Sequence, residues 1–270
     1  MYKRQDVVGL REGDRVLAGT KFGGYTTEIV LPASQVRLTP KQLSHEEAAS
    51  IPVNYMTAWV ALEEMGRVRK GDRVLIQSAA GGVGVAAVQI AREAGAHVVG
   101  LVGSPSKADV VKSLGAAEVR TNDDWEKGTD AEHGGFDIIL DPVGGESMKR
   151  SFRRLAAGGR VICFGASSAI GGPKRSLTKV VRFFAQTPLY TPFKLMDENK
   201  GVYGLNMLGL FGPQGATPIM NRSLDRVIEG FNQGRYKAVV GKTFPLSEGG
   251  AAQEYLQGRS NVGKVILSNN

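Results

Sequence analysis

Cysteine is almost absent from this sequence, since Cys163 is the only one among 270 residues. A single cysteine excludes an intramolecular disulfide and fits a reducing compartment. Histidine is also scarce, and the three residues present, His45, His97 and His133, are far apart in the sequence. Catalytic zinc needs three protein ligands from Cys, His or carboxylate groups. The composition therefore predicts that no metal is bound.

Long apolar runs are missing as well. No window approaches the ~20 consecutive apolar residues that a membrane span requires, and no charged stretch followed by an apolar run opens the chain. We therefore expect a cytoplasmic location. Hydrophobic residues make up 42% and charged residues 22% of the chain, which is ordinary for a soluble globular protein.

Acidic residues are outnumbered, and the net charge is +8. The excess lies between residues 146 and 200, where eleven Lys and Arg stand against three Asp and Glu. A basic surface of this kind attracts anionic phosphates, acidic lipid or nucleic acid. We interpret it as a solvated face near an anionic cofactor, because no nucleic-acid-binding motif accompanies it.

The middle of the chain alternates short apolar runs with segments of helical period. This alternation is typical of βαβ units around a parallel sheet. Strands are expected at 73–77, 96–102, 136–140, 160–164 and 201–205, with helices near 83–94, 107–114 and 147–155 and after Pro218. Residues 13–38 read as short strands, and residues 236–270 as a strand and an amphipathic helix. An α/β core is thus flanked by pieces that could form a second domain.

The decisive motif is Ser78-Ala79-Ala80-Gly81-Gly82-Val83-Gly84, which connects an expected strand to an expected helix. Glycines at such a turn let a pyrophosphate approach the helix N-terminus, where free N–H groups and the helix dipole bind it. The sequence therefore predicts a dinucleotide-binding Rossmann domain.

The next expected strand indicates which dinucleotide is bound. A carboxylate usually follows the glycines by ~20 residues and binds the ribose hydroxyls of NAD. The corresponding segment, residues 102–107, has no carboxylate but contains Ser104, Ser106 and Lys107. Two hydroxyls and an ammonium suit a 2′-phosphate, so NADPH is predicted. The alternative is that Lys107 is a solvated residue in the first turn of a helix.

At these residues the sequence resembles the zinc-independent quinone oxidoreductase branch of the medium-chain dehydrogenases/reductases, from about Gly13 to Leu267. The matching motifs are Gly13-Asp14-Arg15-Val16, Gly23-Gly24-Tyr25, Pro52 to Ala58, Ala79 to Gly84, Leu140 to Gly145 and Asn261 to Lys264. Within the branch, Gly172-Pro173-Lys174-Arg175 together with Asn261 to Lys264 is most similar to vesicle amine transport protein homologues.

The resemblance implies a Rossmann doubly wound parallel sheet plus a GroES-like β-barrel. The implied division is a partial GroES-like domain at 1–54, a nucleotide-binding domain at 55–234 and a C-terminal stretch at 235–270 that returns to the first domain. Family members have several barrel strands before the counterpart of Gly13, whereas only twelve residues precede it here. We therefore expect an incomplete barrel.

The resemblance also implies roles for individual residues. Ala80, Gly81, Gly82, Val83 and Gly84 would hold the pyrophosphate, and Ser104 and Lys107 the 2′-phosphate. Asn122 stands where relatives often have a tyrosine that grips this phosphate. Asn54, Thr57, Val143, Phe164, Gly165, Leu205 and Asn206 would lie near the nicotinamide, and Asn261 and Lys264 would close over the cofactor. Asn54 and Tyr55 are the nearest candidates for catalysis, although Tyr55 could equally be a packing residue.

Zinc-dependent relatives place a cysteine ligand where this chain has Val53, four residues before Thr57. The implied activity is therefore a metal-free hydride transfer from NADPH to a quinone or an activated alkene or carbonyl. The alternative is an NADPH-binding, membrane-associated regulatory protein with little turnover. The resemblance further implies a homo-oligomer when full length.

Three other sequence patterns favour a structural role. Tyr190 and Lys194 have the spacing of the short-chain dehydrogenase pair, but Pro188 and Pro192 disfavour one continuous helix. Cys163 lies in an apolar run and is expected in the core. Residues 174–184 alternate basic and apolar side chains, which favours a helix packed on its own domain or on a partner subunit, with weak membrane contact as the alternative.

Overall fold

The computed structural model describes residues 7, 9–128, 134–170, 177–212 and 215–269. Its centre is a six-stranded parallel sheet with the spatial order β5-β4-β3-β6-β7-β8. The strands are β3 (Arg73–Ile76), β4 (His97–Val102), β5 (Glu118–Thr121), β6 (Phe136–Asp141), β7 (Leu155–Cys163) and β8 (Gly201–Gly204). Numbered within the sheet this order is 3-2-1-4-5-6, the Rossmann arrangement. The predicted doubly wound sheet is confirmed.

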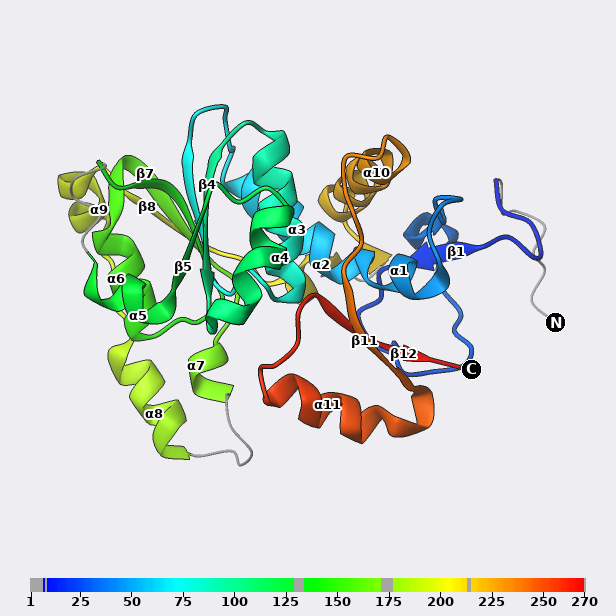
Figure 1. Cartoon of the computed structure of the whole chain (residues 1–270). Coiled ribbons are helices and arrows are strands. Elements are labelled where there is room, and N and C mark those ends of the chain that lie inside the picture. Colours follow the sequence, from blue (N-terminus) through cyan, green and yellow to red (C-terminus); the bar gives the residue numbers. More distant parts are fainter. Residues whose placement is uncertain (1–6, 8, 129–133, 171–176, 213–214, 270) are drawn as a thin grey trace.

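Helices cover both faces of this sheet (Figure 1). One face packs on α2 (Ile51–Trp59), α3 (Gly82–Glu93), α4 (Ala108–Ser113) and α10 (Pro218–Asn232). The other face packs on α5 (Asn122–Lys127), α6 (Glu146–Arg153) and α9 (Pro192–Glu198). Central strands buried on both faces read as continuous apolar runs, which explains why β3, β4 and β6 were predictable.

The ends of the chain form small sheets beside α1 (His45–Ala49) and α2. β1 (Val16–Ala18) pairs with β2 (Val36–Leu38) in antiparallel fashion, and β11 (Val240–Pro245) pairs with β12 (Lys264–Ser268) in parallel. α11 (Gly249–Gln257) connects the latter two. Residues 13–38 thus contain two strands of three residues, fewer than the pattern predicted.

The remaining elements are short. They are α7 (Ser167–Ile170), α8 (Leu177–Gln186), the strand pair β9 (Phe211–Gly212) and β10 (Gly215–Ala216), a π-helical turn (Val60–Met65), and 3₁₀ turns η1 (Ala33–Gln35), η3 (Pro105–Lys107), η5 (Met207–Leu210) and η6 (Leu246–Glu248). α2 runs through residue 54, so the predicted limit of the first domain falls inside a helix. The helix predicted at 147–155 ends at Arg153, and Leu155 begins β7.

An aromatic cluster joins α2 to α10. The ring of Tyr55 lies 4.8 Å from that of Phe231 and 5.8 Å from that of Tyr236, all measured between centroids. Tyr55 and Phe231 are each 1% exposed. Large buried rings dominate core energetics, so this cluster fixes α10 over the helix that contains Asn54 and Thr57.

We predict that Phe231→Ala lowers the free energy of unfolding by about 3–5 kcal/mol, because it leaves a cavity among buried rings. Denaturant titration of the full chain measures this. Asn232→Ala, at the adjacent exposed position of the same helix, is the matched control and should change stability by less than about 0.5 kcal/mol. Equal effects of the two substitutions would contradict the prediction.

Candidate functional site

The strand order reverses between β3 and β6. The chain leaves β3 toward β4 and leaves β6 toward β7, so the loops that follow these two neighbouring strands diverge to opposite sides. In open α/β sheets a crevice opens at this point, outside the carboxyl ends of the strands, and ligands bind there. The predicted glycine motif follows β3 directly and therefore lies at this crevice.

The glycine motif forms a tight turn into α3. Ser78 has a left-handed φ of +54°, and Gly81 donates its N–H to the carbonyl oxygen of Ser78 at 2.8 Å. A Cβ at Gly84 would overlap that same carbonyl oxygen, and a Cβ at Gly82 would stand 2.8 Å from the Asn54 side chain. Close approach of neighbouring backbone at Gly84, and of the Asn54 side chain at Gly82, thus favours glycine at these positions.

The N-terminus of α3 has no side-chain cap. Gly81 is its N-cap residue, and no side chain accepts a hydrogen bond from the first turn. The N–H groups of Gly82, Val83 and Gly84 are therefore available at the positive end of a twelve-residue helix. A diphosphate fits this arrangement, because it supplies acceptors and negative charge where the helix lacks both.

Asn54 lies over this turn. Its side chain is 5% exposed and packs against Gly82 from α2. Thr57 follows one helical turn later and donates its hydroxyl hydrogen to the carbonyl of Val53 at 2.6 Å. Asn54 thus contacts the glycine turn, and Thr57 lines a cavity together with Val83 from the start of α3.

The predicted phosphate residues gather beyond the end of β4. The hydroxyls of Ser104 and Ser106 are 2.8 Å apart, and the Asn122 amide lies 3.9 Å from a Cβ built on Gly103. Lys107 is also here, but its ammonium is already engaged. It donates to the carbonyls of Arg259 at 2.7 Å and Asn261 at 2.9 Å, so Lys107 is not the freely solvated residue of the alternative interpretation.

These carbonyls belong to residues 258–264, which we call the return segment. Gly263 donates to the carbonyl of Ala80 at 2.8 Å and forms an isolated bridge with Gly81. The Asn261 side chain donates to the Gly263 carbonyl. Burial lowers the pKa of the Lys264 ammonium, the next residue along the chain. The return segment therefore crosses the glycine turn and is fixed at a second point by Lys107.

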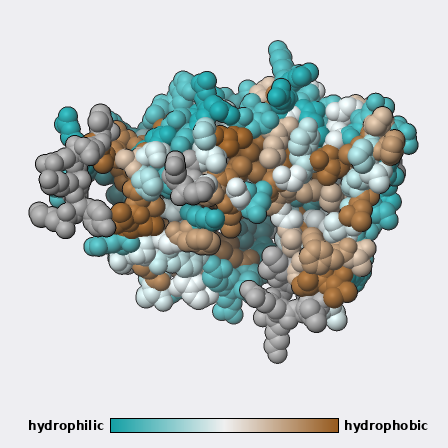
Figure 2. All heavy atoms as spheres, turned by 180° about the vertical axis from the view of Figure 1, so that it is seen from behind, coloured by the Kyte–Doolittle hydropathy of each residue, from teal (hydrophilic) through white to brown (hydrophobic). Residues whose placement is uncertain are grey.

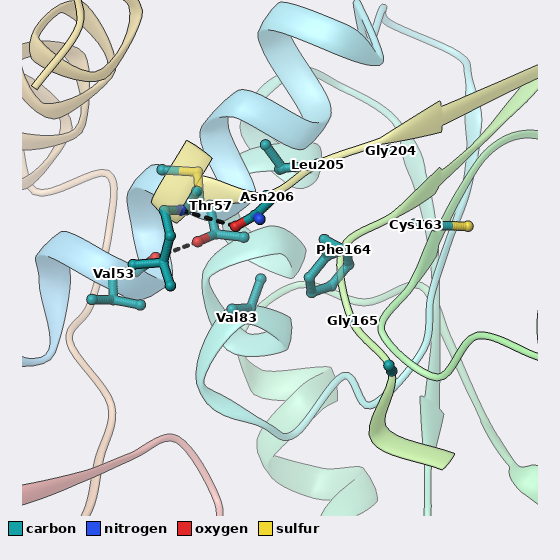
Figure 3. Close-up of a pocket in the computed structure, with 12 residues that line it drawn as sticks. Val53, Thr57, Val83, Cys163, Phe164, Gly165, Gly204, Leu205 and Asn206 are labelled. Carbon is teal, nitrogen blue, oxygen red and sulfur yellow. Dashed lines mark hydrogen bonds between the residues drawn. The ribbon is translucent and has the colours of Figure 1, made fainter. Parts of the chain in front are cut away.

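A cavity of about 610 Å³ lies at the other end of the crevice (Figure 3). Its lining includes the predicted Thr57, Val83, Phe164, Gly165, Leu205 and Asn206, together with Val53, Cys163, Ala166, Gly204, Met207 and Leu208. The lining is mostly apolar with a few polar groups, as in most small-molecule sites. None of these last six was predicted as a site residue, although the apolar residues Met207 and Leu208 soon after β8 were a readable signal.

Val143, another predicted site residue, is not among the residues that line this cavity, and a buried carboxylate holds its backbone. Asp141, 0% exposed at the end of β6, accepts hydrogen bonds from the backbone N–H groups of Val143 and Gly144 at 2.8 and 2.9 Å. Ser147 and Ser151 donate to its other oxygen. A buried charge is tolerated when hydrogen bonds satisfy it in this way, and here it fixes the loop between β6 and α6.

Three comparisons with known proteins agree with this geometry. The zinc-binding dehydrogenase family model matches residues 82–209. The quinone oxidoreductase of Thermus thermophilus has a solved structure that is 32% identical, with a TM-score of 0.79, and the match covers 96% of this chain and 78% of that one. The chain belongs to the medium-chain dehydrogenase/reductase superfamily.

Other members of the superfamily are similar to it as well. The mouse synaptic vesicle membrane protein VAT-1 homolog is 32% identical over 260 residues, which are 95% of this chain and 63% of the mouse protein. The human VAT-1 homolog-like protein has a solved structure with 28% identity and a TM-score of 0.80, covering 98% of this chain and 74% of that one. The chain thus spans less than two thirds of the length of the mouse relative.

The hydrogen bonds of Tyr55 decide between the two roles expected for it, catalysis and packing. The Tyr55 hydroxyl donates to the carbonyl of Lys237 at 2.7 Å and accepts from the Gln89 amide at 2.8 Å. Burial raises the pKa of Tyr55 well above its ordinary value. Tyr55 is also not among the residues that line the cavity. These contacts favour packing, one of the two roles that the sequence left open for Tyr55.

Tyr190 and Lys194 do not form the pair of a short-chain dehydrogenase. Tyr190 precedes α9, which begins at Pro192, so Tyr190 and Lys194 do not share a helix face. Within the described ranges, no three His, Cys, Asp or Glu side chains gather closely enough to hold a metal ion. No helix in the described part of the chain is long and apolar enough to cross a membrane.

The basic segment predicted at 174–184 is only partly described, since Lys174 and Arg175 lie outside the described residues. From Leu177 it forms α8, and Figure 2 shows apolar side chains gathered over this region. Phe183 packs near Gly144, but Val181 is 60% and Phe184 70% exposed. The expected packing of the apolar face on its own domain is therefore incomplete.

Cys163 is expected to be chemically inert. Burial, reinforced by the charge of Asp141, raises the pKa of its thiol to about 12. A raised pKa keeps the thiol neutral at pH 8, and the thiolate is the nucleophile. Iodoacetamide at pH 8 should leave the folded chain unmodified and add one carbamidomethyl group in denaturant, as measured by mass spectrometry. Rapid alkylation of the folded chain would contradict this.

Proposed function

We propose that this chain is a zinc-independent, NADPH-dependent oxidoreductase that transfers hydride to a quinone or to an activated alkene or carbonyl compound. The observation that carries the proposal is the uncapped N-terminus of α3 at the reversal point of the sheet, with an apolar cavity at the end of the same crevice. The first binds a diphosphate. The second accommodates a ring and an acceptor.

The solved relatives support the choice of cofactor. The Thermus thermophilus quinone oxidoreductase was described in complex with NADPH, as was mycobacterial Rv1454c, which is 26% identical with a TM-score of 0.72. When bound, a reduced nicotinamide supplies a hydride to an electron-poor carbon. The residues of this chain would bind the diphosphate at Gly82 to Gly84, orient the ring near Thr57 and exclude water with Val83, Phe164 and Leu205.

The zinc-independent part of the proposal rests on ligand chemistry. Val53 occupies the position of a cysteine ligand, and an isopropyl group cannot coordinate metal. Protonation of the reduced acceptor is assigned to solvent, because Tyr55 is committed to the Lys237 carbonyl. The proposal further includes a cytoplasmic location and a homo-oligomer.

Lys107 tests the preference for NADPH. A charge-assisted hydrogen bond contributes about 1.5–3 kcal/mol, and 1.4 kcal/mol is a factor of ten in affinity. Lys107→Met should therefore raise the Kd for NADPH at least about tenfold more than that for NADH, as measured by fluorescence titration. Lys112→Met, on the exposed side of α4, is the control. An equal loss for both dinucleotides would show that Lys107 acts only by fixing the return segment.

Steady-state oxidation of NADPH tests the activity directly. The full chain should reduce members of a quinone and enone panel at rates above the uncatalysed background, and the rates should not change after treatment with EDTA. Tight NADPH binding without turnover would contradict the enzymatic proposal.

A second candidate is favoured by the exposed apolar residues of α8. Val181 and Phe184 on a basic segment fit weak binding to acidic lipid, which would make the chain an NADPH-binding protein at a membrane surface. Binding in a flotation assay to vesicles containing phosphatidylserine, but not to neutral vesicles, together with the absence of turnover, would favour this function.

A further inference from the structure

Asn206 is placed between β8 and η5, at the edge of the cavity. Its side-chain oxygen accepts a hydrogen bond from the backbone N–H of Leu208 at 3.1 Å. A backbone N–H can only donate, so the group that faces it must be the amide oxygen. The orientation of the carboxamide is thereby fixed, and its NH₂ group is directed away from η5.

Figure 3 shows the consequence for the cavity. The oxygen of Asn206 is turned to the backbone of η5, and its nitrogen lies on the side of Phe164. No described residue accepts a hydrogen bond from this nitrogen. Asn206 is itself exposed, so its two N–H groups are accessible to a molecule in the cavity.

The other polar side chains that line the cavity do not offer such an N–H donor. The Thr57 hydroxyl hydrogen is committed to the Val53 carbonyl at 2.6 Å, so toward the cavity Thr57 can only accept. The Cys163 side chain points away from Asn206 (Figure 3). The remaining lining side chains are apolar or are glycine. Among the described lining residues, Asn206 therefore provides the side-chain N–H donor.

We infer that the Asn206 amide nitrogen donates a hydrogen bond to the carbonyl oxygen of the acceptor, and that the acceptor is an enone or a quinone. This inference rests on the proposed function. A donor held in place before the reaction stabilises an oxygen on which negative charge develops. Enones and quinones place the charge on oxygen, whereas a simple alkene has no such atom.

The electron balance agrees with this assignment. A reduced nicotinamide would supply the hydride by breaking one of its own C–H bonds, and the hydride would form a new C–H bond at the electron-poor carbon of the acceptor. The π electrons of that carbon's double bond would shift toward the carbonyl oxygen. The product of this step would be an enolate. For a quinone this enolate is the keto tautomer of a hydroquinone monoanion, and exchange of protons with water converts it to the hydroquinone. Water would then supply one proton. The acceptor gains one hydride and one proton while the nicotinamide loses the hydride, so the two-electron reduction balances. Asn206 stabilises the anionic oxygen and loses no proton.

Asn206→Asp is the sharpest test. The aspartate keeps an oxygen that accepts from Leu208 and so preserves the start of η5, but it replaces the donor by an acceptor. Asn232→Asp makes the same chemical change at an exposed position at the end of α10 and is the matched control. Thermal melting verifies that both variants fold. If Asn206→Asp does not fold, Asn206→Ser replaces it in the test, because serine keeps a shorter hydrogen-bond donor and should retain part of the activity.

We expect Asn206→Asp to lower kcat/KM for enones and quinones by about 10²-fold, as for the removal of an oxyanion donor, while the Kd for NADPH changes less than twofold. Across a series of ring-substituted quinones, the rate should also depend more steeply on electron withdrawal, because the acceptor must stabilise more of the charge itself. Asn232→Asp should match the wild type in each measurement.

Two results would overturn the inference alone. The first is an unchanged kcat/KM in Asn206→Asp. The second is an increase in the Kd for NADPH as large as the loss in kcat/KM, which would assign the Asn206 amide to the cofactor and not to the acceptor. A wild-type chain that binds no dinucleotide, or binds it without turnover, would instead overturn the proposed function, and this inference with it.

Discussion

The backbone packing of the turn between β3 and α3 sets the position of most other parts of the site. Glycine at 82 and 84 allows the turn to lie against Asn54 on one side and against Ser78 on the other. The first turn of α3 is thereby left uncapped at the reversal point of the sheet. The N–H groups that a side chain would otherwise satisfy are kept for a ligand. The two glycines shape the turn, and the uncapped amides that follow are what makes it suited to an anion.

The return segment adds a second layer over this turn. It is bound to the turn by backbone hydrogen bonds at Ala80 and to the end of β4 by Lys107. Residues more than 150 positions apart in the sequence therefore enclose the same crevice. In the proposed complex, the Lys107 ammonium would contact the 2′-phosphate as well as the two carbonyls of the return segment. Lys107 would then contribute both to the preference for NADPH and to the position of that segment.

The sequence was sufficient for the centre of the fold. β3, β4 and β6 are apolar runs buried on both faces, and the glycine motif between β3 and α3 has a steric signature of its own. β5, with the sequence Glu-Val-Arg-Thr at the edge of the sheet, has no apolar run and was not among the expected strands. The small end sheets were harder to place, because each of their strands needs a distant partner.

The residues of the candidate site likewise differ in how far the sequence alone predicts their roles. Residues within the glycine motif follow from local sequence, whereas the role of Tyr55 stayed open because its partner, Lys237, is 182 positions away. The engagement of Lys107 with the return segment and the fixed orientation of Asn206 also depend on contacts that no periodicity reveals. The role of such side chains can be assigned only when their hydrogen-bond partners are known.

The central claim is that the amides at the start of α3 bind the diphosphate of a nicotinamide dinucleotide. Titration of the ¹⁵N-labelled chain with NADPH, followed by amide NMR, measures this most directly. The amide resonances of Gly82, Val83 and Gly84 should shift together and saturate with the same Kd as the fluorescence signal. If these three resonances stay in place while NADPH binds, or if no NADPH binds at all, the account is contradicted.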